Sequence, residues 1–181
     1  MHKFMISTRL ITIVVGLLLV ITTVQFALSH KTNSSSYPTE ISSARQIEKQ
    51  LACLSKNIYF EAANEPFEGK VAVAQVTLNR VESGNFANTI CGVVQQKNII
   101  LNKTICQFSW FCENDTKVKP INSNHFKESE EVARMVLLEG MRLPSLKEAL
   151  YYHADYVNPK WNKPKIAQIG RHIFYKEKTT L

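Results

Sequence analysis

A glutamate at the end of an apolar helical stripe constrains this chain more than any other feature. The stripe consists of aliphatic residues at steps of four, three and four: Ile47, Leu51, Leu54 and Ile58. That spacing is typical of the buried face of an amphipathic helix, and Glu61 takes its next position. A charged carboxylate on a buried face is costly unless it is paired or protonated. Glu61 is therefore either a satisfied structural group or an acid with a raised pKa, and we favour the acid.

The N-terminus, residues 1–29, is typical of a signal peptide or a membrane anchor. Lys3 and Arg9 precede an uncharged run from Leu10 to Leu28, which is the order of a basic region and an apolar segment in export signals. About 20 apolar residues span a bilayer, so the run suffices for an anchor, while its last residues offer a small-x-small cleavage site. Either outcome places the rest of the chain outside the cytoplasm.

Composition divides the remainder into a linker, one domain and a tail. Residues 30–43 are polar and Ser-rich, which indicates a flexible linker. Residues 44–177 can build one core of ordinary size, since the chain is 45% hydrophobic and 20% charged; residues 178–181 form a tail. The formal charge of +7 fits a bacterial wall, an anionic membrane or nucleic acid. The chain has no basic run interleaved with aromatic residues, which nucleic-acid binding would favour, so we expect no nucleic-acid partner. We expect the protein to be a monomer.

The cysteines fit an exported protein. Cys53, Cys91, Cys106 and Cys112 are even in number, which predicts one or two disulfides. Three complete pairings exist for four cysteines, and the sequence does not choose among them. Free buried cysteines are one alternative. A zinc site is another, but the chain has neither a Cys-x-x-Cys pair nor a His-Glu-x-x-His motif. We expect no metal and no cofactor.

Periodicity predicts a mainly helical α+β domain. The second predicted helix is small and apolar all round, which is typical of a central, buried helix; Pro66 ends the first helix or begins the second. Asn124 is the expected cap of the last helix, and the final two segments are strands that pair antiparallel. In chain order, we expect helices over about residues 44–64, 70–81, 89–94 and 126–141, an irregular segment over 96–122, and strands over 149–155 and 171–175.

The irregular segment carries the sequence Gln-Phe-Ser-Trp-Phe at residues 107–111. Loops of this length in compact domains are often functional, and aromatic rings beside polar groups suit sugar binding. The alternative is a small local core below a disulfide.

Several stretches together resemble a known family. They include Asn-Ile-Tyr-Phe-Glu-Ala-Ala-Asn-Glu at 57–65, Cys-Gln-Phe-Ser-Trp at 106–110 and Tyr-His-Ala-Asp-Tyr-Val-Asn-Pro-Lys-Trp at 152–161. With residues 66–81, 88–95 and 169–175, they resemble SleB/CwlJ-type cell-wall hydrolases in the same order over roughly residues 45–176. Ala63 and Asn64 stand where the family usually has Arg and Gly.

The resemblance implies a compact lysozyme-like fold and an enzyme that cleaves peptidoglycan glycan strands between N-acetylmuramic acid and N-acetylglucosamine. Its better understood members look like lytic transglycosylases that use one glutamate, which falls at Glu61. The sugar 6-hydroxyl is then the nucleophile, and water as the acceptor, as in a muramidase, is the alternative. Glu65 and Glu68 are then supporting carboxylates. The expected substrate-binding residues are Gln107, Ser109 and Tyr152 as hydrogen-bonding groups, and Trp110 and Trp161 as stacking rings.

Two rival functions are compatible with the residues. One is a peptidoglycan-binding domain with weak or lost catalysis, which the retained Glu61 disfavours. The other is an amidase of the stem peptide, which normally needs zinc ligands or a Cys/His pair. His153 and His172 invite a metal or acid/base role, but strand histidines are more often satisfied by the backbone, and no clear ligand set joins them.

Overall fold

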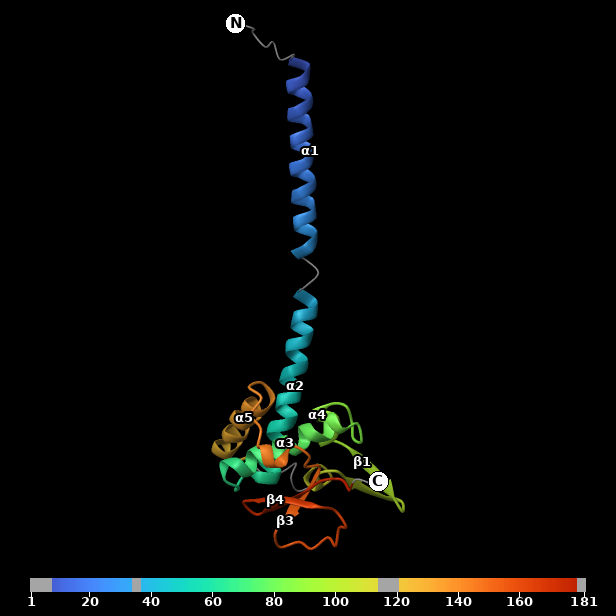
Figure 1. Ribbon diagram of the computed structural model, residues 1–181, viewed down its shortest axis with the longest axis vertical. Coiled ribbons are helices and arrows are strands. Elements are labelled where there is room, and N and C mark those ends of the chain that lie inside the picture. Colours follow the sequence, from blue (N-terminus) through green and yellow to red (C-terminus); the bar gives the residue numbers. More distant parts are fainter. Residues whose placement is uncertain (1–7, 34–36, 114–120, 179–181) are drawn as a thin grey trace. The chain divides into compact units, whose positions relative to one another are not determined.

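A computed structural model describes residues 8–33, 37–113 and 121–178, and the chain divides into two compact units, Met1–Gln46 and Ile47–Leu181 (Figure 1). The first unit contains helix α1, Thr8–Asn33, and the beginning of helix α2, Tyr37–Ala62. Within the described ranges, no helix combines the length and the hydrophobicity that a bilayer span requires. The signal peptide or membrane anchor over residues 1–29 stays a prediction.

Much of the predicted linker, 30–43, is helical. Helix α1 reaches Asn33 and α2 begins at Tyr37, while residues 34–36 lie outside the described residues. Once a helix has formed, each added residue gains a hydrogen bond at little cost, so helices extend beyond their packed part. Pro38 does not prevent this extension, because proline is tolerated in the first turn of a helix.

Helix α3, Phe67–Ser83, is the centre of the second unit, as predicted. Every residue from Gly69 to Arg80 is buried. One side of α3 packs against α2, α4 (Ile90–Val94) and α5 (Ser123–Leu137), through a cluster that includes Leu54, Ile58, Val71, Val93 and Val136. The other side contacts a smaller cluster that includes Ala72, Val76, Leu146, Ala149 and Phe174. The predicted stripe on α2 is buried only in its second half, since Ile47 is 47% exposed and Leu51 is half-buried.

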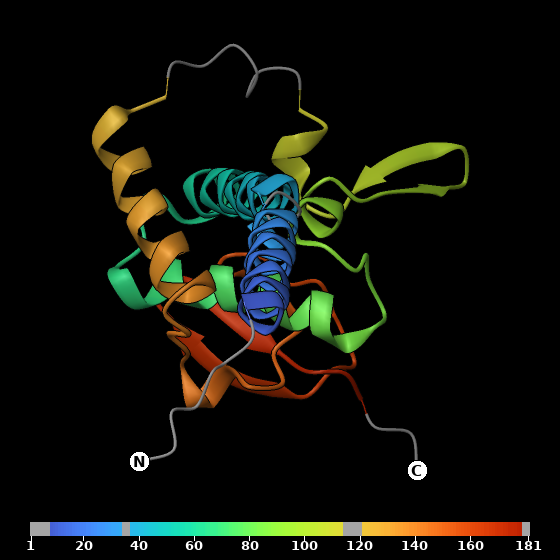
Figure 2. The same ribbon diagram turned by 90° about the horizontal axis from the view of Figure 1, so that it is seen from above.

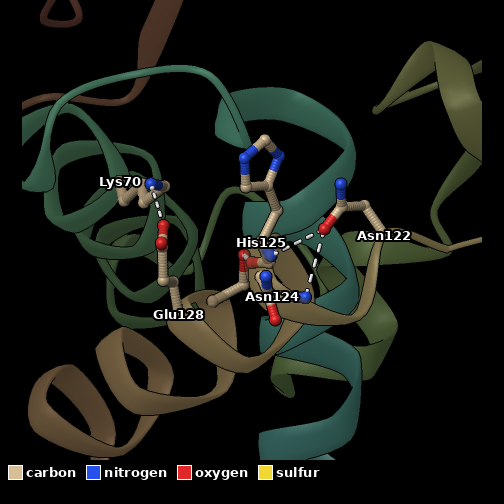
Figure 3. A network of polar contacts seen from close by, with 6 residues as sticks. Lys70, Asn122, Asn124, His125 and Glu128 are labelled. Atoms are coloured by element: carbon tan, nitrogen blue, oxygen red, sulfur yellow. Dashed lines mark hydrogen bonds and ion pairs between the residues drawn. The ribbon is translucent and has the colours of Figure 1, made fainter.

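Side-chain caps begin two of the helices. The Thr89 hydroxyl accepts the backbone N–H of Gly92 at the start of α4. At the start of α5 the cap is Asn122, whose Oδ1 accepts the backbone N–H groups of Asn124 and His125 (Figure 3). The prediction of Asn124 as the cap was wrong by two residues, because Asn122 holds the extended backbone that a cap needs.

An antiparallel sheet closes the second unit. It has strands β3 (Tyr151–Ala154), β4 (Lys165–Ile169) and β5 (His172–Tyr175) in the order β3-β5-β4. The predicted pairing of the last two segments is confirmed, with Tyr152 opposite Phe174. Strand β4 was not predicted. It is an edge strand with an irregular register between Lys165 and Ala167, so its sequence lacks a regular alternation. A short 3-10 helix, η3 (Pro144–Leu146), precedes the sheet.

A β-hairpin occupies part of the segment that we expected to be irregular. Strands β1 (Lys97–Ile100) and β2 (Lys103–Cys106) are joined by Leu101 and Asn102, whose φ angles of 49° and 60° suit the tight turn of a two-residue hairpin. The hairpin projects away from the neighbouring helices (Figure 2). Its residues are nearly all exposed, so the one-sided alternation that marks a core-facing strand is missing. A 3-10 helix, η1 (Ser109–Phe111), follows.

Two disulfides cross-link the second unit. Cys53–Cys91 joins α2 to α4, and Cys106–Cys112 joins the end of β2 to the residue after η1. The prediction of disulfides is confirmed, with both pairs formed. The fold class is also confirmed, as a mainly helical α+β domain with small antiparallel sheets.

Candidate active site

A cleft of about 890 Å³ lies in the second unit. Its walls come from four parts of the chain: the end of α2, one residue of α3, the segment around η1, and the sheet with the loop that follows β3. Among the residues that line it are Glu61, Arg80, Trp110, Tyr152 and Trp161. Helix α2, which carries the apolar stripe, thus ends at this cleft.

Glu61 lies in the last turn of α2 and is half-buried. Burial raises the pKa of its carboxyl group, and the nearby Glu113 carboxylate raises it further. The hydrogen bond from Tyr152 and the positive charge of Arg80 oppose that rise. Burial is the strongest of these influences, so the carboxyl group holds its proton to a higher pH than an exposed glutamate does.

Tyr152 positions the Glu61 carboxyl group. Its phenol oxygen donates to Glu61 Oε2 across 3.0 Å, from strand β3. Burial, more than the nearby carboxylate, raises the pKa of Tyr152 well above its usual range. Tyr152 therefore remains a neutral donor while Glu61 changes its protonation state.

Arg80 supplies a buried positive charge close to this pair. Only 4% of its surface is exposed, and its Nε donates to the backbone oxygen of Leu150 across 2.8 Å. The guanidinium lies over the rings of Phe108 and Tyr152, with centroid distances of 5.1 and 5.9 Å. Burial lowers the pKa of Arg80, but a guanidinium keeps its proton in proteins. Arg80 thus stabilises a carboxylate at Glu61 whenever the proton leaves.

Two amide side chains of α3 hold the segment that leads into β3. Asn79 Nδ2 donates to the backbone oxygens of Leu146 and Ala149, at 2.8 and 2.9 Å. One turn earlier, Gln75 exchanges two hydrogen bonds with the backbone of Leu143. Because Arg80 also bonds Leu150, α3 fixes the backbone that delivers Tyr152 to Glu61.

Trp110 lines the cleft and packs against α2. Its indole Nε1 donates to Asn57 Oδ1 across 3.0 Å, and Asn57 in turn donates to the Thr77 hydroxyl. The Trp110 ring stacks on Phe60, with centroids 4.6 Å apart. A buried amide on α2 therefore fixes the orientation of an aromatic ring that lines the cleft.

Trp161 lies in a second aromatic group at the far side of the sheet. Its ring meets those of Tyr151, His153 and Tyr175 at centroid distances of 6.2, 5.5 and 5.7 Å. It is 41% exposed and lines the cleft, so part of the indole is accessible to a ligand.

The structure brings most of the predicted site residues together. Gln107 and Ser109 line the cleft with Trp110, between Cys106 and Cys112 of the second disulfide. The two supporting carboxylates do not line it. Glu68 is exposed in the first turn of α3.

The Glu65 side chain fills a corner between the end of α2 and the turn before β5, next to Gly69 and Gly170. Its Oε2 accepts the backbone N–H of Arg171 across 2.9 Å. A Cβ at Gly170, whose φ is +55°, would overlap that same oxygen, and a Cβ at Gly69 would lie 2.8 Å from the Glu65 Cβ. Two glycines thus leave room for this side chain.

The two histidines of the sheet, His153 and His172, have different surroundings. His153 bonds the Tyr175 hydroxyl through Nε2 and the backbone oxygen of Ala154 through Nδ1. His172 is buried, which lowers its pKa and favours the neutral ring. In the described part of the chain, no cluster of three or more His, Cys, Asp or Glu side chains is arranged to hold a metal ion.

Three further residues line or support the cleft, and no role was predicted for them from the sequence: Arg80, Asn57 and Glu113. Arg80 and Asn57 are polar residues on otherwise apolar helix faces, and that exception is the signal that could have found them. Glu113 follows a cysteine in the irregular segment, where spacing gives no indication of what it faces.

The chain matches the Cell Wall Hydrolase family over residues 64–175. It belongs to that family. Glu61 lies just before the matched range, and the predicted resemblance is confirmed.

The chain is also similar to spore cortex-lytic enzymes. It is 30% identical to the spore cortex-lytic enzyme of Bacillus subtilis (strain 168) over 125 residues, which is 67% of this chain and 35% of the relative. It is 31% identical to that of Oceanobacillus iheyensis over 133 residues, 71% of this chain and 42% of the relative. The chain thus spans less than half the length of these relatives.

Solved structures of catalytic domains agree with this kinship. The SleB catalytic domain of Bacillus cereus shares 30% identity and a TM-score of 0.53, covering 71% of this chain and 91% of that domain. The catalytic domain of the germination-specific lytic transglycosylase SleB of Bacillus anthracis gives 30% identity and a TM-score of 0.52, covering 70% of this chain and 93% of that domain.

Proposed function

We propose that this chain cleaves the glycan strands of bacterial peptidoglycan, between N-acetylmuramic acid and N-acetylglucosamine, with Glu61 as the general acid. The observation that carries the proposal is the Glu61 carboxyl group, half-buried in a cleft of about 890 Å³ and with a raised pKa. Glycoside cleavage needs a protonated carboxyl group to assist departure of the leaving oxygen, and burial is the usual way to provide one at neutral pH.

The proposed reaction uses Glu61 twice. Its proton first moves to the glycosidic oxygen while the bond from that oxygen to the muramic C1 breaks. The Glu61 carboxylate then removes the proton of the muramic 6-hydroxyl as that oxygen bonds C1, which gives a 1,6-anhydro end and restores the acid. Tyr152 and Arg80 stabilise the carboxylate between the two steps. Glu113, the second carboxylate among the described residues that line the cleft, takes no covalent part.

The remaining cleft residues bind the sugars. Trp161 and Trp110 offer rings to the apolar faces of the pyranoses. Gln107 and Ser109 offer hydrogen bonds to N-acetyl and hydroxyl groups. The segment of chain between Cys106 and Cys112 thus contributes both kinds of contact, and the disulfide fixes it.

We also propose that the domain acts outside the cytoplasm, where peptidoglycan is found. Two disulfides support this location, since such bonds persist in oxidising compartments. The kinship with spore cortex-lytic enzymes supports the wall as substrate.

Mass spectrometry of the products tests both which bond is cleaved and whether the reaction is a transglycosylation. Purified sacculi are digested with the full chain and with Glu61→Gln. The proposal expects muropeptides with anhydro-muramyl ends from the wild type and a near-complete loss in the variant. Reducing muramyl ends would show that the enzyme hydrolyses the bond and is not a transglycosylase. Cleavage of the stem peptide alone would contradict glycan cleavage altogether.

A further inference from the structure

The β1–β2 hairpin carries aliphatic side chains that the described part of its own domain leaves largely uncovered. Leu101 at the turn is 92% exposed and Ile99 is 78% exposed, while Ile100 and Ile105 are 52% and 47% exposed. The hairpin extends beyond the helices that surround its base (Figure 2). Single exposed aliphatic residues are normal, but a group of them at one projecting tip marks an interaction surface.

The register places these side chains on both faces of the hairpin. Ile99 is paired with Thr104, whereas Ile100 is paired with Lys103. Successive residues of a strand point to opposite faces, so Ile99 lies on one face and Ile100 on the other, with Leu101 at the end. A flat protein surface would cover only one of these faces. A lipid layer, by contrast, surrounds an inserted tip on every side.

The charges of the hairpin favour an anionic layer. Lys97 and Lys103 are its only charged residues, and it has no acidic residue between them or as far as Cys106. Lysine beside apolar side chains is typical of segments that bind the interface of anionic membranes. Lysine on an exposed strand also opposes pairing with a second strand, which disfavours a dimer built edge to edge.

We propose that this hairpin tip inserts into the surface of membranes that contain anionic phospholipid. Ile99, Ile100 and Leu101 enter the apolar boundary, and Lys103 contacts lipid phosphates. Strand β2 ends at Cys106, immediately before Gln107 of the cleft wall. Insertion therefore holds one wall of the cleft close to the bilayer, so that substrate next to the membrane is favoured. The proposal does not depend on the reaction that the cleft performs.

A tryptophan at the turn reports the insertion directly. We expect Trp fluorescence of the full-length Leu101→Trp variant to move to shorter wavelength with vesicles of phosphatidylglycerol and phosphatidylethanolamine, and to be quenched by brominated acyl chains. The parent chain supplies the background from Trp110 and Trp161. A matched control is Leu138→Trp, since Leu138 is 46% exposed just after α5; its tryptophan should be unaffected even if another part of the chain binds the vesicles.

Second-site variants in the Leu101→Trp chain give the size of the effect. Ile99→Ser should lower the vesicle partition coefficient, measured by the tryptophan introduced at the turn, by about tenfold, the cost of losing one buried aliphatic side chain. Lys103→Gln should weaken binding at low salt and remove part of its salt dependence. Absence of lipid quenching at position 101 overturns the proposal. So does a blue shift that grows with protein concentration without lipid, which would identify a second copy as the occupant.

Discussion

Glu61 faces the cleft and accepts a hydrogen bond from the phenol of Tyr152, whereas Glu65, four residues later, accepts the backbone N–H of Arg171 in a corner between two glycines. Both carboxylates belong to the same short stretch of chain at the end of α2. Around Glu61, burial and a nearby carboxylate raise the pKa and leave the group beside open space. Around Glu65, a backbone donor and close packing occupy the side chain. We therefore propose that their surroundings make the Glu61 carboxyl group reactive and the Glu65 carboxylate structural.

The largest expected effect is that of Glu61→Gln. The amide keeps the shape of the side chain but has no acidic proton, so activity on sacculi should fall by about 100- to 10,000-fold, the usual contribution of general acid catalysis. Thermal unfolding should change little. Glu113→Gln is the companion variant: if it alone abolishes activity, a second catalytic carboxylate exists and the single-glutamate mechanism is wrong.

Gly170→Ala should have the next largest effect, on stability. A Cβ there overlaps Glu65 Oε2, and the left-handed backbone adds strain, so we expect a loss of about 2 kcal/mol in the free energy of unfolding. Urea denaturation measures it. The matched background is Glu65→Ala, which by itself should cost about 1 kcal/mol for the lost hydrogen bond. With the glutamate side chain gone, Gly170→Ala should cost measurably less. Strictly additive losses would mean that Glu65 does not fill this corner.

Tyr152→Phe should change the pH dependence of activity. The lost hydrogen bond normally lowers the pKa of Glu61, so its removal raises that pKa further. Activity that requires protonated Glu61 is lost as pH rises through the pKa, and this alkaline limb should therefore move to higher pH. Initial rates across pH provide the measurement. Tyr151→Phe is the control, because the Tyr151 hydroxyl bonds Glu177 instead; an equal shift in both variants would exclude a specific role for Tyr152.

The smallest expected effect concerns an ion pair near the Glu65 corner. Lys70 Nζ lies 2.8 Å from Glu128 Oε2 and joins α3 to α5 (Figure 3). The hydrogen bond from Lys70, with its charge, lowers the pKa of the exposed Glu128. The contribution is thus present above the unfolded-state pKa and is lost as pH falls through the lower folded-state value. Glu128→Gln should reduce stability slightly at neutral pH and not in acid; a constant difference would contradict the ionic origin.

The sequence predicted the parts of this molecule that periodicity governs. Leu54 and Ile58 define the buried face of α2, and the uniformly apolar pattern of α3 predicted a central helix. The hairpin tip around Leu101 and the edge strand β4 escaped prediction, because exposed and edge strands need no one-sided alternation of apolar residues. Side-chain partners from distant segments were out of reach for a different reason. The bonds of Tyr152 to Glu61 and of Trp110 to Asn57 depend on how α2, η1 and β3 pack together, and local pattern contains no information on that packing.

The most direct test compares the two glutamates on the same substrate. Release of soluble muropeptides from purified sacculi is measured for the wild type, Glu61→Gln and Glu65→Gln, at a temperature where all three are folded by circular dichroism. We expect that Glu61→Gln releases almost nothing and that Glu65→Gln keeps a substantial fraction of the wild-type rate. Equal release by the wild type and Glu61→Gln, or loss confined to Glu65→Gln, would contradict it.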